Sequence, residues 1–116
     1  PLSSSAASDV YKRQALADWR QGNRERIAAR AELFQQVMTS LEGWELLSTG
    51  AYFGYVRHPY RDMDSFAVAM RMASEVGVLT IPGTFFGDGQ EDFLRFAFAN
   101  AGRDVIAALP DRLTAL

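Results

Sequence analysis

The sequence predicts an α+β fold, in which helices cover a small antiparallel or mixed sheet and the first helix is long. Apolar residues recur at steps of mostly three and four over residues 15–41, which is typical of one helix face. Short runs rich in β-branched and aromatic residues follow, and glycine or proline bounds most of them. The resulting order is helix, strand, strand, helix, strand, strand, helix, with the helices on one side of the sheet.

Residues 1–14 do not have the pattern of a folded domain. Their serine and alanine cluster shows no periodicity. The segment S-S-A-A-S-D-V-Y-K-R-Q also resembles translated sequencing-adapter sequence, and the chain has no initiator methionine. We therefore expect residues 1–14 to be an adapter-derived or disordered tail of a truncated gene product, and residues 15–116 to form the domain.

The long helix is expected over residues 15–41, and Gly43 supplies a C-terminal stop. Its arginines lie mostly off the apolar stripe, as on a solvated helix face. The residues of the stripe are Leu16, Trp19, Ile27, Ala31, Phe34, Met38 and Leu41.

Two strands are expected next, over residues 44–48 and 51–57. The proline after His58 ends the second strand, because proline cannot continue a central ladder. We interpret His58 as a surface or loop residue rather than a catalytic base. The aromatic residues of the second strand are assigned to sheet packing: Tyr52, Phe53 and Tyr55.

Two shorter helices are expected over residues 64–75 and 104–113. Asp64 has the side chain of an N-cap, and Pro110 should remove a hydrogen bond inside the last helix. Gly77 ends the first of these two helices. The residues predicted to face inward from it are Phe66, Ala69, Met70 and Ala73.

The stretch between these two helices organises the chain. Residues 78–81 and 93–98 have the pattern of strands, and a glycine-rich loop over residues 83–89 lies between them. The second strand carries Arg95 among apolar residues. A guanidinium in such a setting needs an anionic partner, and its planar fork matches a carboxylate. From the residues alone, that partner is either a bound ligand or a nearby acid such as Glu91 or Asp92.

The composition excludes several classes of site. The chain of 116 residues has no cysteine and one histidine, so it lacks the residues for a disulfide, a zinc–thiolate centre or a multi-histidine metal site. A net charge of −2 argues against a nucleic-acid surface, and no apolar run has the length of a membrane span. The glycine-rich loop lacks the lysine of a P-loop. We expect a cytoplasmic protein without nucleic-acid or membrane partners.

The stretch over residues 75–99 resembles the C-terminal small domain of pyridoxal-phosphate-dependent aminotransferases of class I/II. The family pattern is E-x-G-V-x-x-x-P-G-x-x-F-G, then a short acidic loop, then a strand with R-x-x-x-A. The matching residues are Glu75, Gly77, Val78, Pro82, Gly83, Phe86, Gly87, Arg95 and Ala99.

This resemblance implies that Arg95 receives the α-carboxylate of an amino-acid substrate. It also implies that Thr84, Phe85 and Phe86 line the substrate cleft, although Phe85 or Phe86 is equally well explained as core. The cofactor would be pyridoxal 5′-phosphate, which such enzymes hold on a lysine. The only lysine, Lys12, falls within residues 1–14. We therefore expect the cofactor lysine in a missing large domain, and the isolated chain to be inactive.

The resemblance further implies a complete enzyme that is a homodimer, acts in amino acid metabolism and takes amino-acid and 2-oxo-acid substrates. Two alternatives remain open. A related pyridoxal-phosphate lyase or decarboxylase would carry the same small domain, and Arg95 does not separate these reactions, because most such enzymes also hold a carboxylate. A small binding domain without catalysis is the other alternative, and the scarcity of lysine favours it.

Overall fold

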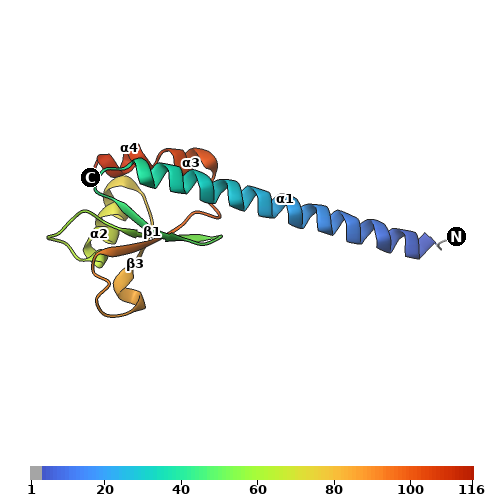
Figure 1. Cartoon of the computed structure of the whole chain (residues 1–116), viewed down its shortest axis with the longest axis horizontal. Helices are drawn as coiled ribbons and strands as arrows, with labels where there is room; N and C mark the ends of the chain where they lie inside the picture. The colour runs from blue at the N-terminus through green and yellow to red at the C-terminus, as the bar shows by residue number, and fades with distance from the viewer. Residues whose placement is uncertain (1–3) are drawn as a thin grey trace.

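The computed structural model describes residues 4–116, and its elements form the α+β fold that the sequence predicts (Figure 1). Besides α-helices and strands it contains a π-helix, η1, and a 3₁₀-helix, η2. The elements in chain order are α1 (Ser4–Ser40), β1 (Glu45–Thr49), β2 (Phe53–Arg57), α2 (Ser65–Arg71), η1 (Met72–Val76), β3 (Ile81–Pro82), η2 (Gly83–Phe86), β4 (Phe93–Ala97), α3 (Arg103–Ala107) and α4 (Leu109–Thr114).

The four strands form one antiparallel sheet in the order β1-β2-β4-β3. Alternate residues of β2 and β4 are buried, so each strand has an inner and an outer face. Val56, Leu94 and Phe96 belong to the inner face and lie in the hydrophobic core. Phe53 and Arg95 belong to the opposite, outer face by the same alternation.

Three helices, α1, α3 and α4, pack on the inner face of the sheet. The C-terminal part of α1 contributes Phe34 and Met38, which are fully buried, and α3 and α4 contribute Ile106 and Leu109. Figure 1 shows α1, α3 and α4 on one side of the sheet, with η2 on the other side. Among the described residues the core is therefore built against one face of the sheet, and the outer face carries none of the long helices.

The first helix is longer than the sequence predicts. Residues 4–14 continue it as helix, and residues 1–3 lie outside the described part of the chain. Alanine, glutamine and arginine are good helix formers, and the Gln14 side chain donates to Asp18 one turn on, at 2.9 Å. An adapter origin for this segment and a domain boundary at residue 15 remain predictions.

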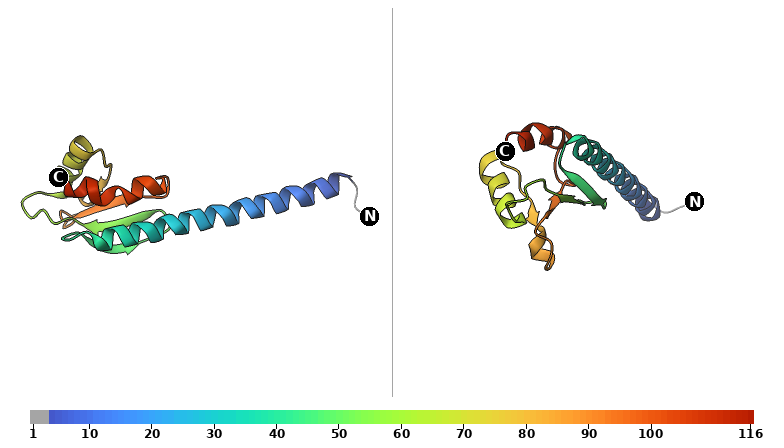
Figure 2. Two further views of the ribbon diagram at one scale, coloured as in Figure 1. Left: turned by 90° about the horizontal axis from the view of Figure 1, so that it is seen from above. Right: turned by 60° about the vertical axis from the view of Figure 1, so that its left-hand side comes forward.

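The N-terminal half of α1 projects away from the domain (Figure 2). Leu16 and Trp19, which the apolar stripe predicts to be inward, are exposed. The stripe is buried only from Phe34 onward, where the sheet and α3 supply a surface to cover it. Helical periodicity predicts which residues share a face, but it does not predict whether anything covers that face.

The second helix also differs from the prediction. Asp64 caps it through a bond from the Ala67 amide, but Phe66 and Met70 are exposed, not inward. The buried side is shifted by one residue from the predicted one, and Ala69 is buried as predicted. The buried residues are Ser65, Val68, Ala69 and Met72. The reason is that α2 packs against β3 and η2 at the sheet edge rather than over its centre.

Two further boundaries are corrected. The strand predicted over residues 78–81 is reduced to Ile81–Pro82, the part that pairs with β4. The helix predicted over residues 104–113 is split at Ala108, where Pro110 lies in the first turn of α4. A proline tolerates the first turn because the amide it lacks has no partner there.

Candidate functional site

Arg95 lies at the centre of β4, between two neighbouring strands. It faces Tyr55 of β2 and Ile81 of β3 in the antiparallel register. Its side chain is on the outer face of the sheet and is half-buried. A strand in the middle of a sheet holds this side chain more rigidly than a loop would.

Two aromatic rings lie against the guanidinium of Arg95. Its Cζ is 4.2 Å from the ring centre of Phe53 and 4.6 Å from that of Phe86. Phe53 comes from β2 and Phe86 from the end of η2, so the rings approach from the two sides of β4. Both distances lie within the range of a cation–π interaction.

The guanidinium has no acidic partner among residues 4–116. The two ion pairs of this part of the chain are Arg57–Glu45 at 3.8 Å and Arg71–Glu75 at 3.0 Å. The alternative that Arg95 forms a salt bridge with Glu91 or Asp92 is therefore not realised. The Nε atom is buried and makes no hydrogen bond to any described residue, which leaves a polar group without a partner there.

A hollow of about 400 Å³ opens beside the guanidinium. Aromatic, glycine and polar residues surround it, and Arg95 supplies its positive charge. The residues that line it are Tyr55, Phe86, Gly87, Asp88, Gln90 and Arg95.

The loop between η2 and β4 shapes one wall of this hollow. Gly87 and Gly89 have φ of +147° and +80°, values that favour glycine. The hydroxyl of Tyr55 donates to Oε1 of Gln90 at 2.6 Å, and burial raises the pKa of the Tyr55 phenol. A Cβ on Gly83, at the start of η2, would lie 2.8 Å from the same hydroxyl and clash with it. Glycine, which has no Cβ, avoids this clash.

The three residues predicted to line a cleft are not brought together. Phe86 lies against Arg95 and lines the hollow. Thr84 instead contacts Ser65 on α2, whose Oγ accepts from its amide at 3.3 Å. Phe85 is exposed and lies near Phe66, with ring centres 6.3 Å apart. Neither Phe85 nor Phe86 is part of the hydrophobic core.

His58 lies in the loop after β2, one of the two predicted settings, but it is buried rather than on the surface. Its Nδ1 accepts from the amide of Tyr60 at 3.2 Å, and its Nε2 lies 2.9 Å from the carbonyl of Glu91. A neutral ring with its proton on Nε2 satisfies both contacts. The amide of His58 also donates to the carbonyl of Asp92, so this residue fixes the chain just before β4.

Sequence reasoning assigned Phe53 and Tyr55 to sheet packing and did not single out Gln90. Alternate side chains of a strand point to opposite faces, so the sequence of β2 already places Phe53 and Tyr55 on one face. What the sequence did not show is the register, which sets Tyr55 opposite Arg95 and Phe53 opposite Ala97. A shift of one residue would have turned both rings to the core.

The described residues offer little for holding a cofactor or metal. Lys12 lies on the projecting part of α1 and is exposed. No group of three potential metal-ligating side chains occurs within residues 4–116, and no helix there is long and apolar enough to cross a membrane.

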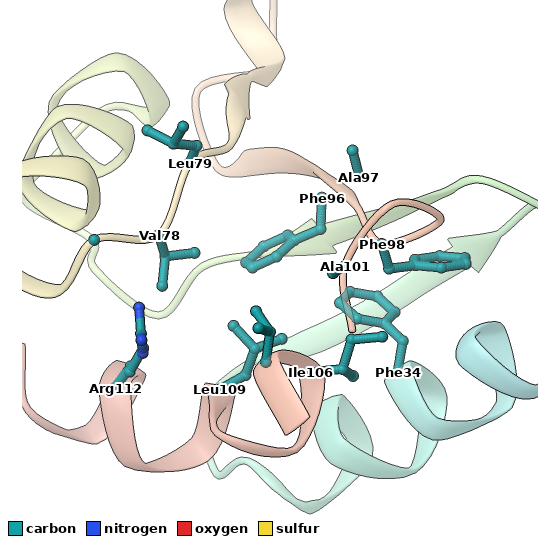
Figure 3. Close-up of a pocket in the computed structure, with 12 residues that line it drawn as sticks. Phe34, Val78, Leu79, Phe96, Ala97, Phe98, Ala101, Ile106, Leu109 and Arg112 are labelled. Atoms are coloured by element: carbon teal, nitrogen blue, oxygen red, sulfur yellow. The ribbon is translucent and has the colours of Figure 1, made fainter. Parts of the chain in front are cut away.

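A second cavity, of about 240 Å³, lies between the inner face of the sheet and the C-terminal helices. Figure 3 shows Phe34, Phe96, Ile106 and Leu109 turned toward one another within it. Its lining is almost entirely apolar, and the guanidinium of Arg112 at one end donates to the carbonyl of Val76 at 3.2 Å. We interpret this cavity as part of the core.

Solved structures of three aminotransferases resemble this fold. An aspartate aminotransferase variant from Thermus thermophilus aligns with a TM-score of 0.72 and 20% identity, over 90% of this chain and 28% of its own. An aminotransferase from Mycobacterium tuberculosis aligns with a TM-score of 0.68 and 24% identity, over 82% of this chain and 25% of its own. An aspartate aminotransferase from Rhodobacter sphaeroides aligns with a TM-score of 0.65 and 19% identity, over 78% of this chain and 23% of its own.

At these identities the structural likeness shows a shared fold, and the chain spans about a quarter of the length of these proteins. A sequence search of curated proteins gives no match. The family model for class I and II aminotransferases, in contrast, matches residues 1–113, which is nearly the whole chain. The chain therefore belongs to the class I and II aminotransferase family.

Proposed function

We propose that this chain is the small C-terminal domain of a pyridoxal-phosphate-dependent aminotransferase, and that Arg95 receives the α-carboxylate of its substrate. The complete enzyme moves an amino group from an amino acid to a 2-oxo acid. Membership of the family supports the reaction class. The observation that carries the role of Arg95 is a guanidinium without an acidic partner, next to an open hollow.

The surroundings of Arg95 fit a carboxylate ligand. A guanidinium donates two parallel hydrogen bonds to a carboxylate, which fixes its orientation as well as its position. Phe53 and Phe86 keep water from part of the group, and charge interactions are stronger where water is excluded. Asp88 also lines the hollow, but it is exposed and forms no ion pair with Arg95 among the described residues.

Pyridoxal phosphate needs a lysine that holds it, and we infer that this lysine lies outside the chain. Pyridoxal phosphate, when bound, supplies the electron sink for reactions at the α-carbon. Lys12 is the only lysine, and its exposed position on α1 does not fit a cofactor attachment site. We place that lysine in a large domain outside this chain, in an enzyme that acts as a cytoplasmic homodimer in amino acid metabolism.

The test is an assay of the complete protein that contains this chain. A panel of amino donors with 2-oxoglutarate or pyruvate would be compared in the wild type and in Arg95→Gln. We expect kcat/KM to fall about 100-fold in the variant, because a charged hydrogen bond to the substrate is lost. Arg57→Gln is the matched control, since Arg57 also lies on the outer face, with its Cζ 5.2 Å from the ring centre of Phe93.

The results separate the alternatives. An equal loss in both variants would contradict a specific role for Arg95. Cofactor binding with loss of the α-carboxyl group or of a side-chain group, and no amino transfer, would indicate a decarboxylase or lyase instead. Absence of pyridoxal phosphate binding in the complete protein would leave the small binding domain as the better explanation.

A further inference from the structure

We propose that Phe53 and Phe86 are positioning residues, which hold the guanidinium of Arg95 so that a carboxylate binds end-on to its two terminal nitrogens. This inference rests on the proposed function of Arg95 and adds how the group is held and which of its nitrogens bind. We refer to Phe53, Phe86 and Arg95 together as the aromatic clamp.

The clamp is assembled from three separate segments. Phe53 is two residues before Tyr55, which faces Arg95, so it is the diagonal neighbour of Arg95 across the β2–β4 pair. Phe86 ends η2, which directly follows β3 on the far side of β4. The two rings therefore reach the same guanidinium from opposite neighbours of its strand.

The clamp restricts which nitrogens a ligand can reach. The Nε atom of Arg95 is buried and has no hydrogen-bond partner. Its terminal nitrogens also donate no hydrogen bond to any residue from 4 to 116. Since Nε is closed to solvent, a carboxylate that forms two hydrogen bonds must use the terminal pair.

Aromatic partners suit this task better than an acid does. The negative face of a phenyl ring attracts a cation and offsets part of the penalty of removing it from water. An aspartate or glutamate in the same place would occupy the fork and compete with the substrate. The rings stabilise the charge, limit rotation of the long side chain and leave its donors free, which is preorganisation for an anion.

Tyr55 contacts the clamp through Phe86 and is itself held by Gln90. The ring of Tyr55 lies 6.5 Å from that of Phe86, at an interplanar angle of 73°. It also stacks on Phe93 at 5.3 Å and 12°. The hydroxyl is bound to Gln90, so the wall of the hollow and the clamp are linked through one side chain.

The first experiment measures kinetics of the complete protein with Phe53→Leu, Phe86→Leu and Phe86→Tyr. Leucine keeps the apolar volume but removes the ring. We expect KM for the amino donor to rise about tenfold in each leucine variant, with kcat changed less than threefold. Phe86→Tyr keeps the ring, so its KM for the amino donor should stay close to that of the wild type. Phe66→Leu is the control, because Phe66 is 50% exposed, as Phe86 is at 49%, and has no contact with Arg95.

The second experiment does not depend on activity. In the 116-residue chain, ring currents should shift the Arg95 Nε–H proton signal upfield, and Arg95→Gln identifies that signal by its loss. Phe86→Leu should reduce the shift, and Phe66→Leu should not. On titration with acetate, the terminal nitrogens should respond more than Nε. An unshifted Nε–H signal, or a larger response at Nε, would overturn the clamp.

The two proposals fail in different ways. If Arg95→Gln leaves kcat/KM unchanged, the carboxylate role itself is wrong, whatever the position of the Nε–H signal. If Arg95→Gln reduces kcat/KM but both leucine variants keep the wild-type KM, only the clamp is wrong.

Discussion

The hydroxyl of Tyr55 donates a hydrogen bond to Oε1 of Gln90 at 2.6 Å, and so joins the centre of the sheet to the loop that precedes β4. Tyr55 faces Arg95 directly across the β2–β4 pair. The contact therefore links the strand that carries the guanidinium to the wall of the hollow in front of it.

Tyr55→Phe removes this hydrogen bond and keeps the ring. We expect the free energy of unfolding to fall by about 1 kcal/mol, which is typical for one neutral hydrogen bond. Urea titration of the chain would measure the change. Tyr52→Phe is the control, because Tyr52 is exposed and its hydroxyl forms no hydrogen bond within residues 4–116. Equal effects of the two substitutions would show that the Tyr55–Gln90 bond has no stabilising role.

Gly54 of β2 lies against the side chain of Phe34 from α1. A Cβ at this position would overlap Cε1 of Phe34, a ring that is fully buried and cannot move aside. Gly54→Ala should therefore destabilise the chain by about 2 kcal/mol, in the range of overpacked cores.

Gly50→Ala provides the comparison for Gly54. The nearest atom to a Cβ at Gly50 is the carbonyl oxygen of Phe53 at 3.9 Å, which is an ordinary contact. We expect its urea midpoint to stay close to that of the wild type. A Gly54→Ala variant as stable as Gly50→Ala would mean that α1 is not seated on β2 in solution.

The sequence was informative where a local pattern decides the structure. Side-chain chemistry within a few residues predicts that Asp64 caps a helix and that Pro110 interrupts the last helix. It also predicts the strands that contain Tyr55 and Arg95. The family pattern singled out Arg95, and the structure places it at the centre of the sheet.

The remainder depends on long-range packing, which a single sequence does not reveal. The contact of Phe53 with Arg95 requires the β2–β4 register. The burial of His58 requires the backbone of Glu91 to pass beside it. Likewise, Phe66 shares its helix with Val68, but the position of the sheet edge alone decides which of the two is buried.

The two halves of α1 should differ in their contribution to stability. Phe34 is fully buried and stacks on Phe98 with ring centres 5.0 Å apart, whereas Trp19 is 60% exposed. We expect Phe34→Ala to reduce the free energy of unfolding by about 3–5 kcal/mol and Trp19→Ala by less than about 0.5 kcal/mol. Urea titration followed by circular dichroism would test this. A large loss in Trp19→Ala would mean that the projecting half folds back onto a surface of the chain.

Alkaline pH should weaken the fold through two tyrosines. Burial raises the pKa of Tyr55 above its ordinary value near 10. Burial also raises the pKa of Tyr60, where the nearby Arg71 charge opposes the shift and Glu75 adds to it. The unfolded chain then loses these protons at lower pH than the folded chain does.

Because the folded state binds more protons above pH 10, stability is fully present below that value and falls as pH rises through the raised pKa values. Urea midpoints between about pH 8 and pH 11 would show the decline. The double variant Tyr55→Phe/Tyr60→Phe should start from a lower midpoint but decline less steeply, whereas Tyr52→Phe should keep the wild-type slope. If the double variant declines as steeply as the wild type, groups other than these two phenols cause the alkaline loss.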